Sequence, residues 1–389
     1  MEKIKNIAAY KILDSRGEET IKVKIFSQNF FAEFSLPQGK SKGKYEARYL
    51  APEKAIENIK KIIFPKIKNK EVNFQKIDQI LLSLDKTPNK RKIGGNATLG
   101  VSIACAKLQA KIEKKPLFLF LERFFKKKKK KKSPPFLLMN VINGGLHAKG
   151  GVAFQEYHLI LKEKSLKESV FLGAKLYRKL GEKLETNIGD EGGYVPQMQD
   201  EKEPLFLLQK IKKRKIVSLG LDVAASSFFK NGKYFLKNKT LNFDELLNFY
   251  LAIEREFDLL YLEDPFEESG FEKFSLLRKK LKKTLICGDD LTVTNKERLK
   301  EAIKKSAIDL LLVKPNQIGT LSETIEAINF ARENNIDVIV SHRSGETEDT
   351  FIADLAVACN AWGAKFGAPA RGERTAKYNR LIEIENGYF

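Results

Sequence analysis

The amino-acid sequence predicts an α/β protein in which a small N-terminal α+β domain precedes an irregular (β/α)₈ barrel. Six apolar runs in the second half of the chain each end in a charged residue, and these residues recur every 23 to 41 positions. Each interval holds one amphipathic stretch of helical length. Because parallel strands covered on both faces are apolar throughout, this alternation indicates the strands and helices of a parallel barrel.

The first part of the chain has a different pattern. Residues 1–33 contain two strand-like segments separated by DSRGEET, and Phe31–Phe34 is expected as a third strand that leads into the loop SLPQGKSKG. Residues 46–83 and 96–125 are predicted to be helical, with Asn96 as the N-cap of the second helix. These elements form the expected α+β domain.

The lysine run Lys126–Lys132 and the following Ser-Pro-Pro interrupt any helix, so the domain boundary is expected between 1–133 and 134–389. The apolar segments FLLMNVI and EYHLILK come next. No helix separates them, so we expect them to be antiparallel. Helices are predicted at 166–185 and 201–213. The barrel is therefore expected to begin as ββαα before the regular repeats.

The charged ends of the six apolar runs are the candidate site. The acids come first and the basic residues follow; they are Asp222, Glu263, Asp289, Lys314, His342–Arg343 and Lys365. A single charge at this position could simply cap a strand. Six in this order favour a functional site, because (β/α)₈ enzymes carry their chemistry at the C-terminal strand ends. Three acids opposite basic groups suggest a divalent metal and an anionic substrate.

Several strings resemble the enolase family, in the family's order and over nearly the whole chain. The most specific is SHRSGETEDTFIADLAV at 341–357; the others are MNVINGGLHA (139–148), GDEGGYVP (189–196), LDVAASSFFKNGKY (221–234), YLEDPF (261–266), GDDLTVTN (288–295) and LVKPNQIGT (312–320). DSRG and PQGKSKG are similar to parts of the family's N-terminal domain. The resemblance implies reversible dehydration of 2-phosphoglycerate to phosphoenolpyruvate in glycolysis.

The resemblance also implies two Mg²⁺ ions in each active site. Asp222, Glu263 and Asp289 match the ligands of one ion, and Ser41 matches a ligand of the second. Asp290, the neighbour of Asp289, remains an alternative ligand. Carboxylates suit Mg²⁺, which prefers hard oxygen donors.

The reaction roles are implied in the same way. Lys314 matches the base that removes the C2 proton, and nearby cations are expected to lower its pKa. Glu191 matches the acid that protonates the leaving C3 hydroxyl, with Asp190 as an alternative, and Glu156 matches its assistant. The substrate contacts are expected from Ser41, His147, Gln155, Glu156, His342, Arg343, Ser344 and Lys365, with His147 also catalytic. His158 lies outside the motifs and is expected to be structural.

The formal net charge of +21 allows a second interpretation, in which a catalytically impaired enolase scaffold binds RNA or another polyanion. The lysine run lacks interleaved aromatic residues, which favours a solvated surface. Nothing resembles a signal peptide or a membrane span. Three scattered cysteines fit a reducing cytoplasm.

Ser41 and His147 match residues on two loops that, by the resemblance, close over the substrate as lids. Departures from the family pattern concern these lid loops and the chain end. Lys40 and Lys42 flank Ser41, Leu146 replaces a usual glutamate, and the chain ends earlier than is usual. The family suggests a homodimer joined by a glutamate–arginine contact. Here Lys22 and Glu383 stand at those two positions, which predicts a contact with both charges reversed.

Overall fold

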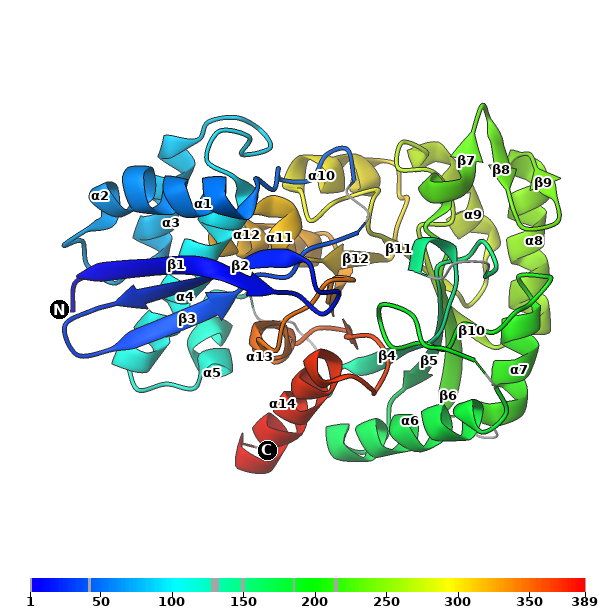
Figure 1. Cartoon of the computed structure of the whole chain (residues 1–389). Coiled ribbons are helices and arrows are strands. Elements are labelled where there is room, and N and C mark those ends of the chain that lie inside the picture. The colour runs from blue at the N-terminus through cyan, green and yellow to red at the C-terminus, as the bar shows by residue number, and fades with distance from the viewer. Residues whose placement is uncertain are drawn as a thin grey trace.

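The computed structural model describes residues 2–40, 43–126, 133–147, 151–184, 186–212 and 216–388. Its N-terminal unit and its barrel lie side by side (Figure 1). The N-terminal sheet is antiparallel in the order β1-β2-β3, with strands β1 (Asn6–Leu13), β2 (Glu19–Phe26) and β3 (Phe31–Ser35). The three predicted strands are therefore confirmed.

The turn between β1 and β2 explains why DSRG separates two strands. The Asp14 carboxylate accepts hydrogen bonds from the backbone N–H groups of Arg16 and Glu18, at 2.8 and 3.0 Å. Gly17 has a φ of 76°, a left-handed conformation that glycine adopts without a steric penalty. Asp14 also pairs with the Arg16 guanidinium at 3.0 Å, so the turn is held by its own side chains.

The two predicted N-terminal helices are each broken, so these predictions were wrong in extent. The first region contains α1 (Pro52–Asn58), a π-helical turn (Ile59–Ile63), α2 (Phe64–Ile67) and α3 (Phe74–Leu84). Lys68 leaves the helical conformation with a ψ of 134°, and Asn73 caps α3 by accepting a hydrogen bond from Lys76 N. Residues 46–51 are not helical. Helix α1 begins at Pro52, whose fixed φ suits a first helical position.

The second region contains α4 (Gly95–Ile112) and α5 (Leu117–Glu122). The break follows from Lys114, which has a φ of 52°, and from Pro116, which lacks an N–H group to continue the helix. Asn96 is not the N-cap, because Gly94 holds that position. The Asn96 side chain instead bonds both backbone groups of Leu50, at 2.8 and 3.2 Å, and ties α4 to the preceding loop.

The barrel closes in the order β10-β11-β12-β13-β14-β4-β5-β6. Its strands are β4 (Phe136–Asn143), β5 (Glu156–Leu161), β6 (Val217–Asp222), β10 (Leu259–Glu263), β11 (Leu285–Gly288), β12 (Leu310–Val313), β13 (Asp337–Ser341) and β14 (Gly363–Lys365). Strand β5 is antiparallel to β4 and to β6, and the other neighbours are parallel. The irregular ββαα start of the barrel is thus confirmed.

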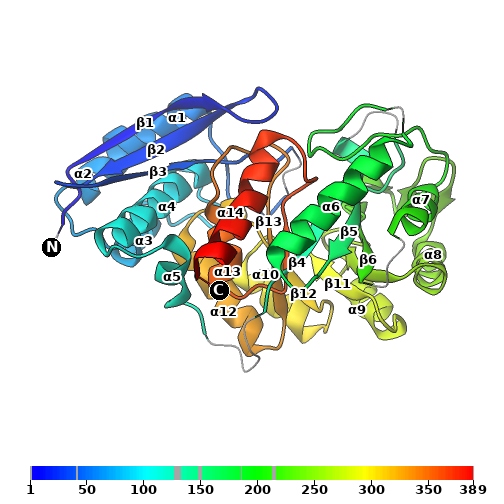
Figure 2. The same ribbon diagram turned by 90° about the horizontal axis from the view of Figure 1, so that it is seen from below.

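Helices surround the barrel: α6 (Leu166–Gly181), α7 (Glu203–Lys212), α8 (Phe243–Glu256), α9 (Phe271–Lys280), α10 (Lys296–Lys304), α11 (Pro315–Ile318), α12 (Leu321–Glu333), α13 (Phe351–Ala358) and α14 (Gly372–Tyr388). Short helical turns lie at Gly145–His147 and Ala225–Phe228, and a small sheet contains β7 (Phe229–Lys230), β8 (Lys233–Phe235) and β9 (Thr240–Leu241). Helix α14 contacts both α13 and α6 (Figure 2).

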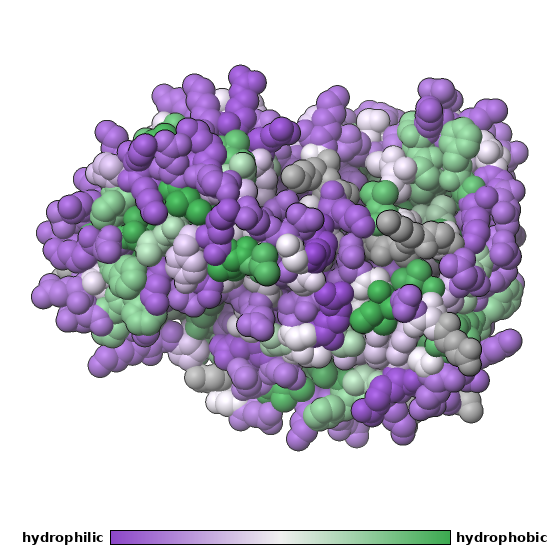
Figure 3. All heavy atoms as spheres, in the orientation of Figure 1, coloured by the Kyte–Doolittle hydropathy of each residue, from purple (hydrophilic) through white to green (hydrophobic). Residues whose placement is uncertain are grey.

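The barrel interior is packed with side chains and is not a channel. A separate inner cluster fills it, with Leu138, Ile160, Tyr261, Cys287, Leu310, Leu312 and Ile339 all buried. Hydrophilic residues dominate the face seen in Figure 3, with apolar patches between them. No helix in the described part of the chain has the length and apolar content that crossing a membrane requires. The predicted run Lys126–Lys132 lies outside the described residues apart from Lys126.

Candidate active site

The predicted strand-end residues meet at the C-terminal mouth of the barrel. Asp222, Glu263 and Lys365 are the last residues of β6, β10 and β14. Asp289, Lys314 and His342 directly follow β11, β12 and β13. In the sheet register Asp222 pairs with Glu263 on one side and with Glu156 on the other. Neighbouring strands therefore bring Asp222 and Glu263 together, as the sequence predicted, and place Glu156 beside them.

Lys365 is the centre of the acidic group. Its Nζ lies 2.6 Å from Glu263 Oε2, 2.9 Å from Asp222 Oδ2 and 3.2 Å from Glu156 Oε1, and its side chain is 1% exposed. Burial acts to lower the pKa of Lys365, but the surrounding carboxylates outweigh burial and raise it. The ammonium therefore stays charged and compensates the buried acids.

The acids around Lys365 titrate in different directions. Burial and the neighbouring Asp222 raise the pKa of Glu263 to about 8. Burial acts to raise the pKa of Asp222 as well, but Lys365 outweighs it and the pKa is lowered. Burial and Glu191 raise the pKa of Glu156 well above its ordinary value. Asp222 therefore stays ionised, whereas Glu263 and Glu156 can hold protons near neutral pH.

Lys314 forms a second, partly buried pair, with Asp289. Gln317 donates to the other oxygen of Asp289 at 2.8 Å. Burial acts to lower the pKa of Lys314, but the Asp289 carboxylate outweighs it and the pKa is raised. The nearest partner of Lys314 in this structure is therefore an anion, and the expected lowering of its pKa by the metal ions and Lys365 stays a prediction.

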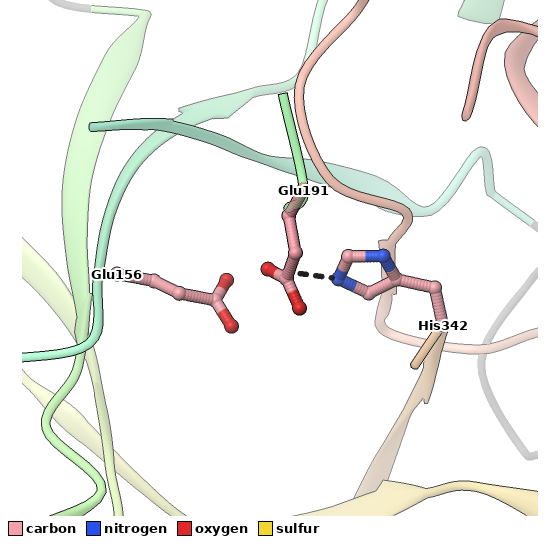
Figure 4. A group of neighbouring side chains, drawn as sticks. All are labelled: Glu156, Glu191 and His342. Atoms are coloured by element: carbon pink, nitrogen blue, oxygen red, sulfur yellow. Dashed lines mark ion pairs between the residues drawn. The ribbon is translucent and has the colours of Figure 1, made fainter. Parts of the chain in front are cut away.

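Glu191 faces Glu156 and His342 across a small space (Figure 4). Its carboxylate accepts a hydrogen bond from Asn140 Nδ2 at 2.9 Å, and His342 Nε2 lies 3.6 Å from Glu191 Oε2. Glu191 is 2% exposed, whereas the alternative acid Asp190 points outward to Lys40 at 3.2 Å. Burial beside other acids is the environment that a proton donor needs, so the geometry favours Glu191 over Asp190.

Arg343 is held by the segment that follows the Ser41 loop. Its guanidinium pairs with both Glu46 carboxylate oxygens at 2.9 and 3.2 Å. The guanidinium also lies against Gly39, where a Cβ would lie 1.8 Å from it, so a larger residue there would displace the guanidinium. Ser344 Oγ accepts a hydrogen bond from Lys40 N at 2.8 Å, and Gln155 donates to Asp222 at 3.2 Å. Ser41 and the side chain of His147 lie outside the described residues.

Two groups of carboxylate and imidazole side chains in the described residues place ligand atoms within 4.8 Å of one another, close enough for a metal ion. They are Glu156 with Glu191 and His342, and Asp264 with Asp289 and Asp290. The predicted set of Asp222, Glu263 and Asp289 is not one of these groups; Lys365 binds two of its members and Lys314 the third. A cavity of ≈ 300 Å³ is lined by Asp222, Asp289 and Asp290 and reaches Gly43, just after Ser41, and Leu146, just before His147.

Three further residues hold the side chains of the site. His158 was expected to be structural, and its Nε2 lies 2.8 Å from Glu156 Oε2, a contact that the sequence analysis did not include. The signal was available, because residues i and i+2 of a strand share a face. Asn140 and Glu46 bond Glu191 and Arg343. Glu46 lies far along the chain from Arg343, and no periodicity connects them.

Comparisons with known proteins agree with this geometry. A family model described as enolase, N-terminal domain, matches residues 4–121, and one described as enolase, C-terminal TIM barrel domain, matches residues 131–388. Enolase from Sulfurisphaera tokodaii is 44% identical over 99% of this chain and 96% of its own length. Enolases from Methanocaldococcus jannaschii and Ureaplasma parvum are 42% and 41% identical, each over 98% of this chain and 95% and 96% of their own lengths.

Proposed function

The chain belongs to the enolase family, and from this premise we propose that it converts 2-phosphoglycerate reversibly into phosphoenolpyruvate at the mouth of its barrel. Its activity is that of phosphopyruvate hydratase, a carbon–oxygen lyase of glycolysis. The observation that carries the site assignment is that the buried Glu156, Glu191 and Lys365 and the partly buried Lys314 gather at the barrel mouth. The full-length match to enolases disfavours the alternative of a polyanion-binding scaffold.

The donor set fits a divalent cation. Glu263 Oε1 is buried and has no hydrogen-bond partner among the described residues, so one oxygen is left for a ligand. Asp222, Glu263 and Asp289 would hold one Mg²⁺, and Ser41 would contribute to a second. All of these donors are oxygens, which Mg²⁺ prefers. When bound, the two cations neutralise the charge that develops on the substrate carboxylate.

The protein groups divide the remaining chemistry among themselves. Lys314 Nζ accepts the C2 proton in its neutral form, which a cation bound to Asp289 would favour, and Glu191 gives a proton to the departing C3 hydroxyl, assisted by Glu156. Arg343 and Ser344 bind the phosphate, because a guanidinium fork matches phosphate oxygens. Lys365 faces the substrate carboxylate, and Ser41, His147, Gln155 and His342 complete the substrate contacts. The proton acceptor and the proton donor thus come from different segments, Lys314 directly after β12 and Glu191 from the loop between α6 and α7.

An absorbance assay of phosphoenolpyruvate formation from 2-phosphoglycerate and Mg²⁺ tests the proposal. Lys314→Ala should lose both dehydration and exchange of the C2 proton with solvent. Glu191→Gln should lose dehydration but retain some exchange, because proton removal precedes loss of the hydroxyl. Asp190→Asn is the matched control and should dehydrate nearly as well as the wild type. Wild-type exchange in Lys314→Ala would show that another group is the base.

We also propose a cytoplasmic homodimer. The three cysteines are buried and none is in a disulfide, which fits a reducing compartment. Lys22 pairs with Glu33 at 3.2 Å and both line a groove of ≈ 670 Å³, whereas Glu383 pairs with Arg380 at 3.2 Å. If two copies bring Lys22 and Glu383 together, Lys22→Glu should weaken the dimer by about 2–5 kcal/mol.

Analytical ultracentrifugation measures this weakening, and the double variant Lys22→Glu, Glu383→Arg should recover most of the loss. A single variant as dimeric as the wild type would contradict the reversed contact.

A further inference from the structure

Arg374, near the start of α14, is buried; its two Nη atoms make hydrogen bonds to groups around the site, and its Nε lies 3.3 Å from Glu373 Oε1. Its Nη1 lies 2.6 Å from His342 Nδ1 and donates to Arg343 O at 2.7 Å. Its Nη2 donates to Ser344 O at 2.6 Å and to Asp190 O at 3.2 Å. The side chain is 0% exposed. One guanidinium therefore joins the strand end that carries His342 to the loop that carries Glu191.

The bond to His342 fixes which ring nitrogen carries the proton. An arginine has only donors and keeps its charge at all physiological pH values, so His342 Nδ1 must accept with its lone pair. The single proton of the neutral ring then lies on Nε2. Nε2 is the nitrogen that faces Glu191 Oε2, at 3.6 Å (Figure 4). Because that lone pair is used for the N–H, His342 is unsuited to bind a metal with Glu156 and Glu191.

The same bond opposes a second protonation of the ring. An imidazolium would have to direct an N–H from Nδ1 at the Arg374 cation. Burial lowers the pKa of His342 well below its ordinary value; Glu191 opposes this, whereas Arg374, Lys365 and Lys314 add to it. A cationic ring beside Glu191 would favour its carboxylate form. Keeping the ring neutral therefore lets Glu191 hold the proton that an acid must deliver.

We propose that Arg374 is a positioning residue that keeps His342 neutral, with its Nε2–H directed at Glu191, so that Glu191 can act as the proton donor. The proposal rests on the role of Glu191 in the proposed function. Arg374 touches no reacting atom in this arrangement and acts only through His342 and the loop around Asp190.

Nitrogen-15 NMR of the imidazole rings tests the proton placement without any activity. The chain has only three histidines, so loss of one signal set in His342→Gln assigns His342. The wild type should show a protonated Nε2 and an unprotonated Nδ1, unchanged from pH 5.5 to 8. A protonated Nδ1 in the wild type would overturn the proposal, even if the enzyme proved inactive on 2-phosphoglycerate.

The variants Arg374→Gln and Arg374→Lys separate positioning from a merely structural role. In Arg374→Gln the His342 ring should titrate. The ratio of C2-proton exchange to dehydration should then rise by about 10-fold or more as the pH falls, because a general acid contributes about 10²–10⁴-fold and only dehydration needs it. Arg374→Lys retains a cationic donor and should keep the wild-type proton placement and most of the wild-type ratio.

The effect should vanish in the background of His342→Gln, whose amide cannot become a cation. There Arg374→Gln should leave the pH dependence of the ratio unchanged. Equal losses of exchange and dehydration in Arg374→Gln at every pH would show that Arg374 only supports the fold, and would overturn the proposal. If Arg374→Gln does not fold, Arg374→Lys and the wild-type NMR spectrum still decide the question.

Discussion

The barrel mouth and the N-terminal sheet contain the same kinds of charged residue in opposite environments. At the mouth, Lys365 is 1% exposed and contacts three carboxylates. On the sheet, Lys22 and Lys24 share Glu33, with side chains 25%, 26% and 41% exposed. Exposed pairs contribute little because water screens them, whereas a buried charge that loses its partner is costly. Burial, and not residue type, decides what each lysine does.

This difference follows from the two kinds of sheet. A closed barrel buries both faces of its strands, so a charge at a strand end is enclosed by neighbouring strand ends and by the loops above them. The antiparallel sheet packs one face on α4 and leaves the other to solvent, and Lys22, Lys24 and Glu33 extend from that open face.

The largest expected effect is the loss of Lys365. Lys365→Met would leave Asp222, Glu263 and Glu156 buried together without their common cation. We expect a loss of about 3–5 kcal/mol in the free energy of unfolding, measured by urea denaturation without metal at pH 7.5. Lys365→Arg is the control, because it retains the charge, and should lose less.

Mg²⁺ sharpens this experiment. A divalent cation can replace the missing ammonium, so saturating Mg²⁺ should raise the melting temperature of Lys365→Met more than that of the wild type. An equal rise in both proteins would contradict the assignment of Asp222 and Glu263 as metal ligands.

A smaller effect is expected from His158 when the pH changes. Burial, aided by Lys365, lowers the pKa of His158 to about 3. The folded protein therefore binds this proton only at a much lower pH than the unfolded chain does, where the pKa is about 6.5. The contribution of His158 to the free energy of unfolding is therefore fully present above about pH 6.5. It is lost by about 1.4 kcal/mol per pH unit as the pH falls from there toward 3.

The difference in unfolding free energy between the wild type and His158→Gln isolates this contribution, because both proteins carry the same acids. The difference should decline from pH 6.5 to pH 5. A difference that stays flat over this range would show that His158 is already protonated in the folded protein.

The smallest effect is expected on the N-terminal sheet. Glu33→Gln removes the partner of Lys22 and Lys24, and for a single copy of the chain it should cost less than about 1 kcal/mol, a loss that 1 M salt erases. Urea denaturation at several protein concentrations measures it. A larger loss that grows with protein concentration would indicate that a second copy covers this sheet.

The sequence predicted the strand ends well because burial on both faces makes each barrel strand a visible apolar run. Asp222, Glu263, Lys314 and Lys365 could be placed at one mouth for that reason. Partners within the mouth could not be predicted, since they depend on loop positions. Glu46, which holds Arg343, and Arg374, which holds His342, both reach the site from segments without a strand-like pattern.

The helices show a further limit of sequence reasoning. Amphipathic patterns continue through a break when the apolar face continues, so residues 46–83 and 96–125 looked like single helices. The helices end instead where the backbone leaves the helical conformation, at Lys68 with a ψ of 134° and at Lys114 with a φ of 52°. Asparagine is a common N-cap residue, but the side-chain amide of Asn96 forms hydrogen bonds with the backbone N–H and C=O of Leu50 instead. This tertiary contact outweighs the local preference for a cap.

The three buried thiols can report the rate at which different parts of the molecule open. Cys105 lies in α4 of the N-terminal unit, Cys287 in the inner cluster of the barrel and Cys359 just after α13. A buried thiol reacts with an alkylating reagent only when its surroundings open, so each labelling rate reports one layer. Slower labelling of Cys287 than of Cys105 would mean that the N-terminal unit opens locally while the barrel remains folded. The opening of each part can thus be timed without adding a foreign probe.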